Sequence, residues 1–149
     1  MMKRRYYSGK FKPLNKNKYL GDVNNITWRS SWERTVFKWC DSNPNVEYWN
    51  SEEVVIPYIS PIDNKQHRYF VDLFIIFKNG SRLLVEIKPK KQTVKPNHNH
   101  KKDKRLSTII NEDATYAINT AKWNSANEFA SRINAKFVIF TEDTIKNLS

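Results

Sequence analysis

Two apolar runs on either side of Asn79-Gly80 constrain this chain more than any other feature of its sequence. Residues 69–77 read Tyr-Phe-Val-Asp-Leu-Phe-Ile-Ile-Phe, and residues 83–88 form a second run that is mostly aliphatic. Aromatic and β-branched residues favour strands, and Asn-Gly between two such runs is a strong signal for a tight turn. The sequence therefore predicts an antiparallel hairpin with one strand over 69–77 and the next over 83–88.

The length of the turn decides which residues of this hairpin face each other. A two-residue type I′ turn would set Asp72 opposite Ile87 and leave a carboxylate on an apolar face, which is costly. A three-residue loop with Gly80 in the left-handed conformation of a G1 bulge sets Asp72 opposite Glu86, with Lys88 on the same face. The other face is then apolar throughout: Val71, Leu73, Ile75, Phe77, Leu83, Val85 and Ile87. We therefore predict the bulged register.

This register brings together a set of groups suited to metal-dependent hydrolysis. Directly opposed residues have Cβ atoms about 4.5–5.5 Å apart, so Asp72 and Glu86 could share a divalent cation. Oxygen ligands favour Mg²⁺ or Mn²⁺, and the backbone carbonyl of Ile87 could add a ligand. A cation such as Lys88 beside that metal suits phosphodiester hydrolysis, because it can orient water and offset developing charge. The alternative is a structural ion pair on a sheet face.

Charge points to nucleic acid as the partner. Among 149 residues, 26 Lys and Arg face 15 Asp and Glu, giving a net charge of +11. The cations concentrate in the stretch before residue 20, where aromatics are interleaved, and in the polar segment 89–105. The first stretch could equally be a solvated tail. The predicted phosphate contacts are Lys3, Arg4, Arg5, Lys10, Lys12, Lys90, Lys91, Lys95, Lys101, Lys102, Lys104 and Arg105.

The remaining patterns complete a single domain. A helical apolar stripe follows Thr27, with Ser30 as N-cap and a stop at Asn43-Pro44. A strand around 54–56 precedes the hairpin, and helical patterns over 114–133, with a possible second capping box at Ser125 and Glu128, precede a strand over 137–140. We predict a basic arm over 1–25 and one α/β domain over 26–149, whose mixed central sheet is flanked by helices on both faces.

Several classes of protein are excluded. The lone cysteine, Cys40, rules out a disulfide framework and a cysteine-based zinc site, and its apolar helical setting indicates a buried thiol. No apolar stretch is long enough to cross a membrane, and the basic start lacks the apolar segment of a secretion signal. His98 and His100 have no third ligand nearby, so solvated loop residues or phosphate contacts are favoured over metal binding. No small-molecule cofactor is expected.

Three motifs carry a resemblance to known nucleases. Asp72, a hairpin and then Glu86-Ile87-Lys88 resemble the PD-(D/E)XK superfamily, with Val71 where proline is usual. The helix with Ser30-Ser31-Trp32-Glu33 is similar to the first helix of TnsA-like endonucleases. Chain length, Ala121-Lys122-Trp123 and residues 137–142 further resemble the head completion nucleases of T-even-type bacteriophages.

This resemblance implies a restriction-endonuclease-like core, Mg²⁺-dependent DNA cleavage and action on DNA-filled phage heads, in the virion or the host cytoplasm, with head or neck proteins as partners. It also implies that Glu33 is a third metal-site carboxylate, whereas the spacing from Ser30 alone favours a helix-capping box. Two rival functions remain: a basic head protein that binds DNA without cutting, and a cutting subunit that needs a transposase-like partner.

Overall fold

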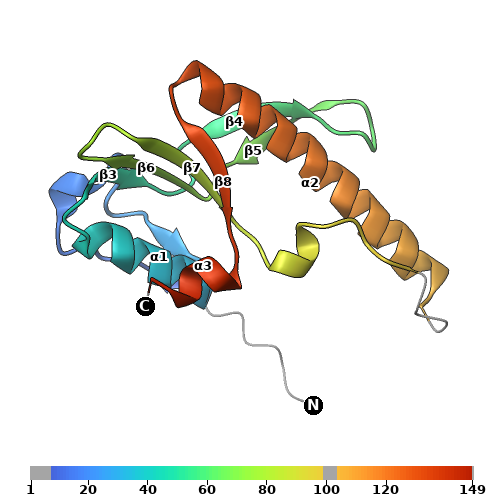
Figure 1. Cartoon of the computed structure of the whole chain (residues 1–149), viewed down its shortest axis with the longest axis horizontal. Coiled ribbons are helices and arrows are strands. Elements are labelled where there is room, and N and C mark those ends of the chain that lie inside the picture. The colour runs from blue at the N-terminus through green and yellow to red at the C-terminus, as the bar shows by residue number, and fades with distance from the viewer. Residues whose placement is uncertain (1–7, 99–103, 149) are drawn as a thin grey trace, which may run out of the picture.

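A mixed four-stranded sheet forms the centre of the protein (Figure 1). The computed structural model describes residues 8–98 and 104–148. The strand order is β3-β6-β7-β8, where β3 is Val46–Asn50, β6 is Leu73–Phe77, β7 is Arg82–Ile87 and β8 is Lys136–Phe140. β6 runs antiparallel to both β3 and β7, and β8 joins β7 in parallel. The predicted mixed α/β sheet is confirmed.

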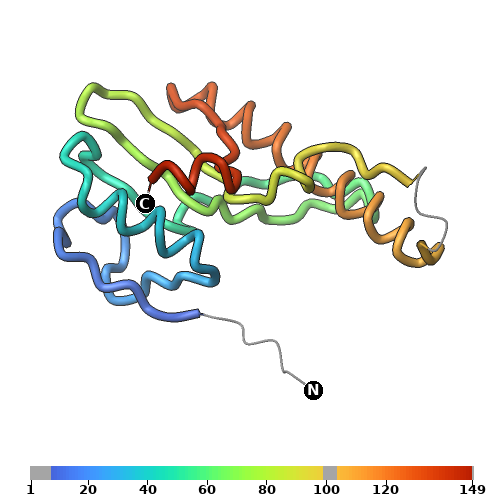
Figure 2. Tube along the Cα trace, turned by 60° about the horizontal axis from the view of Figure 1, so that its bottom comes forward, coloured from blue at the N-terminus to red at the C-terminus, as the bar shows by residue number. Residues whose placement is uncertain are grey.

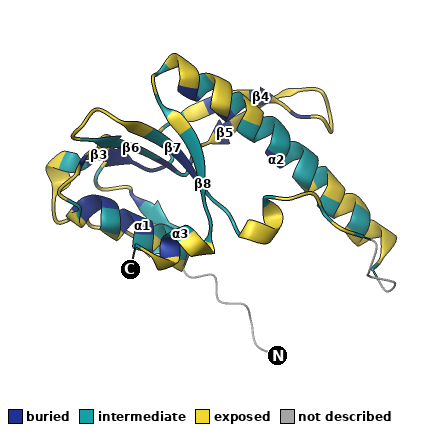
Figure 3. Cartoon of the chain, in the orientation of Figure 1, coloured by how far each residue is buried: buried dark blue, intermediate teal, exposed yellow. Residues whose placement is uncertain are grey.

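Helices cover both faces of this sheet, as predicted. Helices α1 (Ser31–Ser42) and α3 (Glu142–Lys146) lie on one face, and the long helix α2 (Leu106–Arg132) lies on the other (Figure 1). Alternate residues of the strands pack into two separate hydrophobic cores, one on each face, because side chains alternate across a sheet. Leu73, Ile75 and Val85 pack toward α1, whereas Phe74 and Leu84 pack toward α2. Figure 3 shows the central strands buried and the first turns of α2 exposed.

A second, two-stranded sheet extends from this body. Strands β4 (Val55–Ile59) and β5 (Gln66–Phe70) form an antiparallel hairpin that runs beside α2 and away from the compact end of the molecule (Figure 2). Ile56, Tyr58 and Tyr69 turn their side chains to the core shared with α2. The smaller elements are β1 (Gly9–Lys10), η1 (Lys16–Lys18), β2 (Thr27–Trp28) and η2 (Lys90–Gln92).

The hairpin between β6 and β7 adopts the bulged register that the sequence predicts. Leu73 pairs with Val85 and Ile75 with Leu83, so the register places position 72 opposite position 86. Gly80 has φ +90°, and its N–H donates to the Phe77 carbonyl at 2.9 Å. The three-residue loop is therefore confirmed.

The predicted continuous strand over 69–77 is wrong, because the chain breaks at Val71-Asp72. Residues before the break belong to β5 and pair with β4, and residues after it belong to β6 in the central sheet. Val71 consequently packs in the core beneath α2 and does not join the apolar face of Leu73 and Ile75. Periodicity could not reveal the break, since both halves are equally rich in strand-forming residues.

The sequence predicts a basic arm over 1–25. Within that range, Phe11, Leu14 and Asn15 contact the body of the protein. The Phe11 ring lies 5.7 Å from that of Phe37 and 5.8 Å from that of Trp49. The backbone N–H groups of Leu14 and Asn15 donate to the buried carboxylate of Asp41 at 2.8 and 3.0 Å. Residues 1–7 lie outside the described part of the chain.

The helices begin and end partly as predicted. Ser30 caps α1, its Oγ accepting from the Glu33 N–H at 3.1 Å, and Cys40 is buried in that helix. Helix α2 is continuous, so Ser125 and Glu128 lie inside it and do not start a second helix. Helix α3 has no counterpart among the predicted elements. None of the described helices has the length and apolar character needed to cross a bilayer.

The turn yields a first prediction. An added Cβ at Gly80 meets no atom within 4 Å, so Gly80→Ala tests backbone conformation alone. We expect a loss of about 1 kcal/mol in unfolding free energy, because side chains disfavour positive φ. Gly80→Asn is the matched control and should cost less, since Asn tolerates this region. Urea unfolding measures both, and an unchanged Gly80→Ala variant would contradict the bulged turn.

Candidate functional site

The two acidic residues of the hairpin meet where the chain passes from β5 into β6. Glu86 lies on β7 and is buried, and Asp72 occupies the break just before β6, where it is half-buried. The Ile87 N–H donates to Asp72 Oδ2 at 2.7 Å, which fixes the Asp72 carboxylate against the end of β7 beside Glu86. The structure thus brings Asp72, Glu86 and Lys88 together, as the register predicts.

Both oxygens of Glu86 face a neighbouring polar group. The Tyr69 hydroxyl donates to Glu86 Oε2 at 2.5 Å. Lys88 Nζ lies 3.6 Å from Glu86 Oε1, and its side chain keeps a 25% exposed fraction. Burial and the adjacent carboxylate raise the pKa of Tyr69 well above its usual value, so the phenol remains a neutral donor.

Asp72 carries the strongest electrostatic perturbation of the site. Burial first, and then the charge of Glu86, raise the pKa of Asp72 well above its usual value near 3.8. The bond from the Ile87 N–H and the Lys88 charge oppose the shift without cancelling it. The charged form of Asp72 is therefore disfavoured in the free protein, and a bound cation would offset that cost.

Glu33 makes the capping contacts of a helix start and lies close enough to Asp72 to act on its charge. Its backbone N–H bonds to Ser30 Oγ at 3.1 Å, and the same hydroxyl lies 3.4 Å from Glu33 Oε2, which is capping geometry. Its charge also contributes to the raised pKa of Asp72. Burial and then Glu52 raise the pKa of Glu33 itself, while Arg29, ion-paired with Glu52, lowers it.

The oxygens present fit a hard divalent cation. Asp72 and Glu86 supply neighbouring carboxyl groups, and oxygen donors suit Mg²⁺ or Mn²⁺. Within residues 8–98 and 104–148, no three His, Cys, Asp or Glu side chains are grouped closely enough to form a metal site by themselves. Glu33 acts on Asp72 through its charge and is not a preassembled third ligand.

Sequence reasoning missed Tyr69, Arg29 and Glu52 as neighbours of this site. Tyr69 appeared as one apolar position of a long strand, and only the break at Val71-Asp72 lets its hydroxyl reach Glu86. Glu52 precedes β4 with a positive φ of 57°, and its N–H donates to the Val71 carbonyl at 3.1 Å. No local pattern signals either contact.

The predicted phosphate-binding cations have different surroundings. Lys12, Lys91, Lys95 and Arg105 are exposed. Lys10 bonds to Asn25 and Thr27, and Lys90 lies 3.5 Å from Asp143. Lys104 differs most from the prediction, since its side chain is only 8% exposed and pairs with Glu112. Five of the predicted contacts lie outside the described residues: Lys3, Arg4, Arg5, Lys101 and Lys102.

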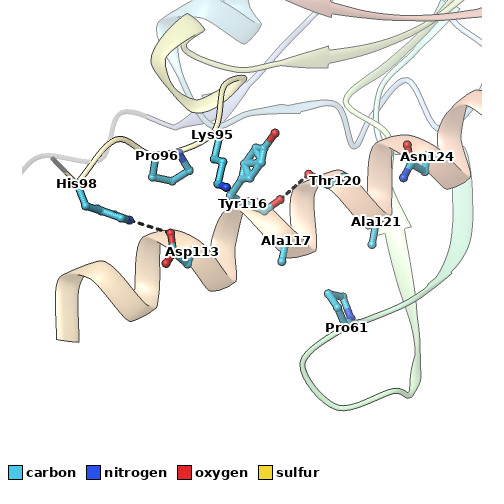
Figure 4. A pocket seen from close by; sticks show the side chains of 10 residues that line it. All are labelled: Pro61, Lys95, Pro96, His98, Asp113, Tyr116, Ala117, Thr120, Ala121 and Asn124. Atoms are coloured by element: carbon cyan, nitrogen blue, oxygen red, sulfur yellow. Dashed lines mark hydrogen bonds and ion pairs between the residues drawn. The ribbon is translucent and has the colours of Figure 1, made fainter. Parts of the chain in front are cut away.

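A hollow of about 700 Å³ lies between α2 and the segment around Lys95–His98, away from the carboxylate pair (Figure 4). Its walls include Pro61, Tyr116 and Ala121, and none of Glu33, Asp72, Glu86 or Lys88. His98 Nε2 bonds to Asp113 at 2.8 Å there, which ties the loop to the helix. His100 lies outside the described residues. The carboxylate pair, and not this hollow, is the candidate active site.

Comparison with known proteins decides the family. The profile of the TnsA-like endonuclease N-terminal domain matches residues 43–142. The chain belongs to the TnsA-like endonucleases. The matched region contains Asp72, Glu86 and Lys88 but starts after Glu33. The chain is also 43% identical over 145 residues to the head completion nuclease of Enterobacteria phage T4, covering 95% of each protein.

The raised pKa of Asp72 yields a stability prediction. A folded-state pKa above the unfolded value means that unfolding free energy falls as pH rises from about 4 through the folded-state value. Asp72→Asn removes this loss and can still accept from Ile87. In EDTA at neutral pH we expect it to raise Tm by a few degrees, since about 1 kcal/mol shifts Tm by roughly 2–4 °C at this size.

The control for this prediction is Asp63→Asn, because Asp63 is an exposed carboxylate that bonds to His67 at 2.8 Å and has a lowered pKa. That variant should not gain stability. Thermal unfolding between pH 4 and pH 8 measures both proteins. An Asp72→Asn protein less stable than the unaltered chain at neutral pH would contradict the crowded-carboxylate description.

Proposed function

We propose that this endonuclease hydrolyses phosphodiester bonds in DNA with Mg²⁺ or Mn²⁺ held by Asp72 and Glu86. The observation that carries the proposal is the pair of neighbouring carboxyl groups, half-buried Asp72 and buried Glu86, in which burial first and then the charge of Glu86 raise the pKa of Asp72. Lys88 supplies a cation next to it, 3.6 Å from Glu86. We propose the Ile87 carbonyl and Glu33 as further ligands, Glu33 acting as a carboxylate that can approach from α1.

Each residue has a distinct role in the proposed reaction. The bound cation would activate water and polarise the scissile phosphate. Asp72 and Glu86 hold it in place, and Asp72 is oriented by the Ile87 N–H at 2.7 Å. The Lys88 ammonium orients the attacking water and offsets the negative charge that develops on the phosphate in the transition state. Partial burial strengthens this effect, because fewer water molecules screen the charges.

The DNA would be gripped by cations on segments that flank this site. Helix η2 begins just after Lys88 and Pro89 and carries Lys90 and Lys91. Lys95 and Arg105 are exposed, and they lie before and after residues 99–103, which are outside the described part of the chain. Lys10 and Lys12 lie in the N-terminal segment. Together with the cations outside the described residues, they would supply a sequence-independent attraction that weakens with salt.

We further propose that the chain acts in completing phage heads after DNA packaging, in the virion or the host cytoplasm, with head or neck proteins as partners. The support is the identity of 43% over 95% of both chains to the head completion nuclease of Enterobacteria phage T4. A non-cutting DNA-binding head protein is less favoured, because such a protein has no use for a destabilising carboxylate pair.

Cleavage of supercoiled plasmid tests the proposed reaction. Asp72→Ala and Lys88→Ala should each lower the Mg²⁺-dependent nicking rate by at least about 100-fold, since each removes transition-state stabilisation. DNA affinity in EDTA should change little. Lys136→Ala is the matched control, because Lys136 lies at the opposite end of the strand next to β7 and should nick normally. Unchanged nicking by Asp72→Ala would end the proposal.

A pair of variants separates the two roles of Glu33. Glu33→Gln keeps a side chain that the capping box accepts but removes the charge, so cleavage should fall while thermal stability holds. Ser30→Ala removes the cap, so stability should fall by about 1 kcal/mol while cleavage at low temperature holds. If Glu33→Gln cuts at the original rate, Glu33 is a capping residue only.

A further inference from the structure

The contact between Tyr69 and Glu86 joins β5 to β7. These two residues would not face each other if β6 continued without a break to Tyr69. Continued beyond Asp72, the register of β6 and β7 would set Tyr69 opposite Pro89, three residues past Glu86. The break at Val71-Asp72 instead places Tyr69 on β5, with its hydroxyl 2.5 Å from Glu86 Oε2. Both residues are buried, with exposed fractions of 4% for Tyr69 and 7% for Glu86.

We propose that Tyr69 is a positioning residue that fixes the Glu86 carboxylate for divalent cation binding. An ionised carboxylate is only an acceptor, and a hydroxyl donating to it makes a short, charge-assisted bond. Because Tyr69 holds Oε2, the carboxylate cannot rotate freely, and Oε1 stays turned toward Lys88 at 3.6 Å. The bond to Oε2 thus fixes the orientation of the carboxylate, while Oε1 faces the side of the site where Lys88 lies.

The ring of Tyr69 is itself held in place from helix α2. It packs in the core with Ala126 and Ala130, and Lys122 Nζ lies 5.6 Å from the ring centroid. A ring fixed in this way delivers its hydroxyl at one position, which a solvent-exposed donor could not do. Groups that orient metal ligands in this manner affect metal affinity and activity by about 10–100-fold.

Tyr58 provides a matched control on the neighbouring strand. It is also buried, lies in the same core, and has Lys122 Nζ 5.8 Å from its ring. Among the described residues its hydroxyl has no hydrogen-bond partner, and its ring contacts His67. Tyr58→Phe and Tyr69→Phe therefore remove the same atom from rings packed in the same core, and only the second removes a bond to Glu86.

The inference rests on the proposed function, and two measurements test it. Isothermal titration with Mn²⁺ on DNA-free protein gives the metal Kd, and plasmid nicking gives the rate. We expect Tyr69→Phe to raise the Mn²⁺ Kd about tenfold and to slow nicking by about 10–100-fold. Tyr58→Phe should remain within about twofold of the unaltered chain in both measurements. In a Glu86→Gln background, Tyr69→Phe should add less than about twofold, since its target has lost its charge.

Each remaining outcome overturns one claim. Tyr69 does not act through Glu86 if Tyr69→Phe leaves the Mn²⁺ Kd and the nicking rate unchanged. The same conclusion follows if Tyr58→Phe weakens Mn²⁺ binding and nicking as much as Tyr69→Phe does, or if Tyr69→Phe has its full effect in the Glu86→Gln background. If Tyr69→Phe no longer folds while Tyr58→Phe does, Tyr69 serves the fold. Asp72→Asn is included to separate the two proposals: normal nicking by that variant overturns the proposed function, whatever Tyr69 does.

Discussion

The close approach of two carboxyl groups, Asp72 between β5 and β6 and Glu86 on β7, is the interaction on which the proposed site depends. Burial and the charge of Glu86 raise the pKa of Asp72, so the charged form of Asp72 is disfavoured in the folded protein. Such local strain is typical of functional sites, where a ligand absent from the free protein provides the compensating interaction.

The remainder of the fold supports this junction from both faces. The bulged turn at Gly80 sets the register that brings Asp72 and Glu86 together, and the first core anchors Leu73 and Val85 beneath them. The break at Val71-Asp72 directs β5 onto α2, where the second core fixes Tyr69. The site therefore lies where two independently packed cores meet, so its geometry depends on both of them.

The sequence predicts contacts between residues close together in the chain better than contacts between residues far apart. The hairpin register was predictable because turn chemistry and the alternation of apolar residues are local and agree with each other. The Ser30 cap is local too. The break at Val71-Asp72 depends on the pairing of β5 with β4, which precedes residues 69–77, and on the packing of Tyr69 and Val71 against the distant helix α2, so no pattern within 69–77 signals it. The partner of Tyr69 was hidden by that break. The covered position of Lys104 arises from a contact between the segment before α2 and Glu112 on that helix, which the charge pattern alone does not show.

The central claim is that Asp72 and Glu86 form one divalent-cation site, and anomalous scattering from crystals soaked in Mn²⁺ tests it most directly. We expect a strong anomalous peak in contact with carboxylate oxygens of both residues, and its loss in an Asp72→Asn crystal soaked in the same way. A peak confined to other carboxylates, such as Asp113 beside His98, or no peak near Glu86 at saturating Mn²⁺, would contradict it.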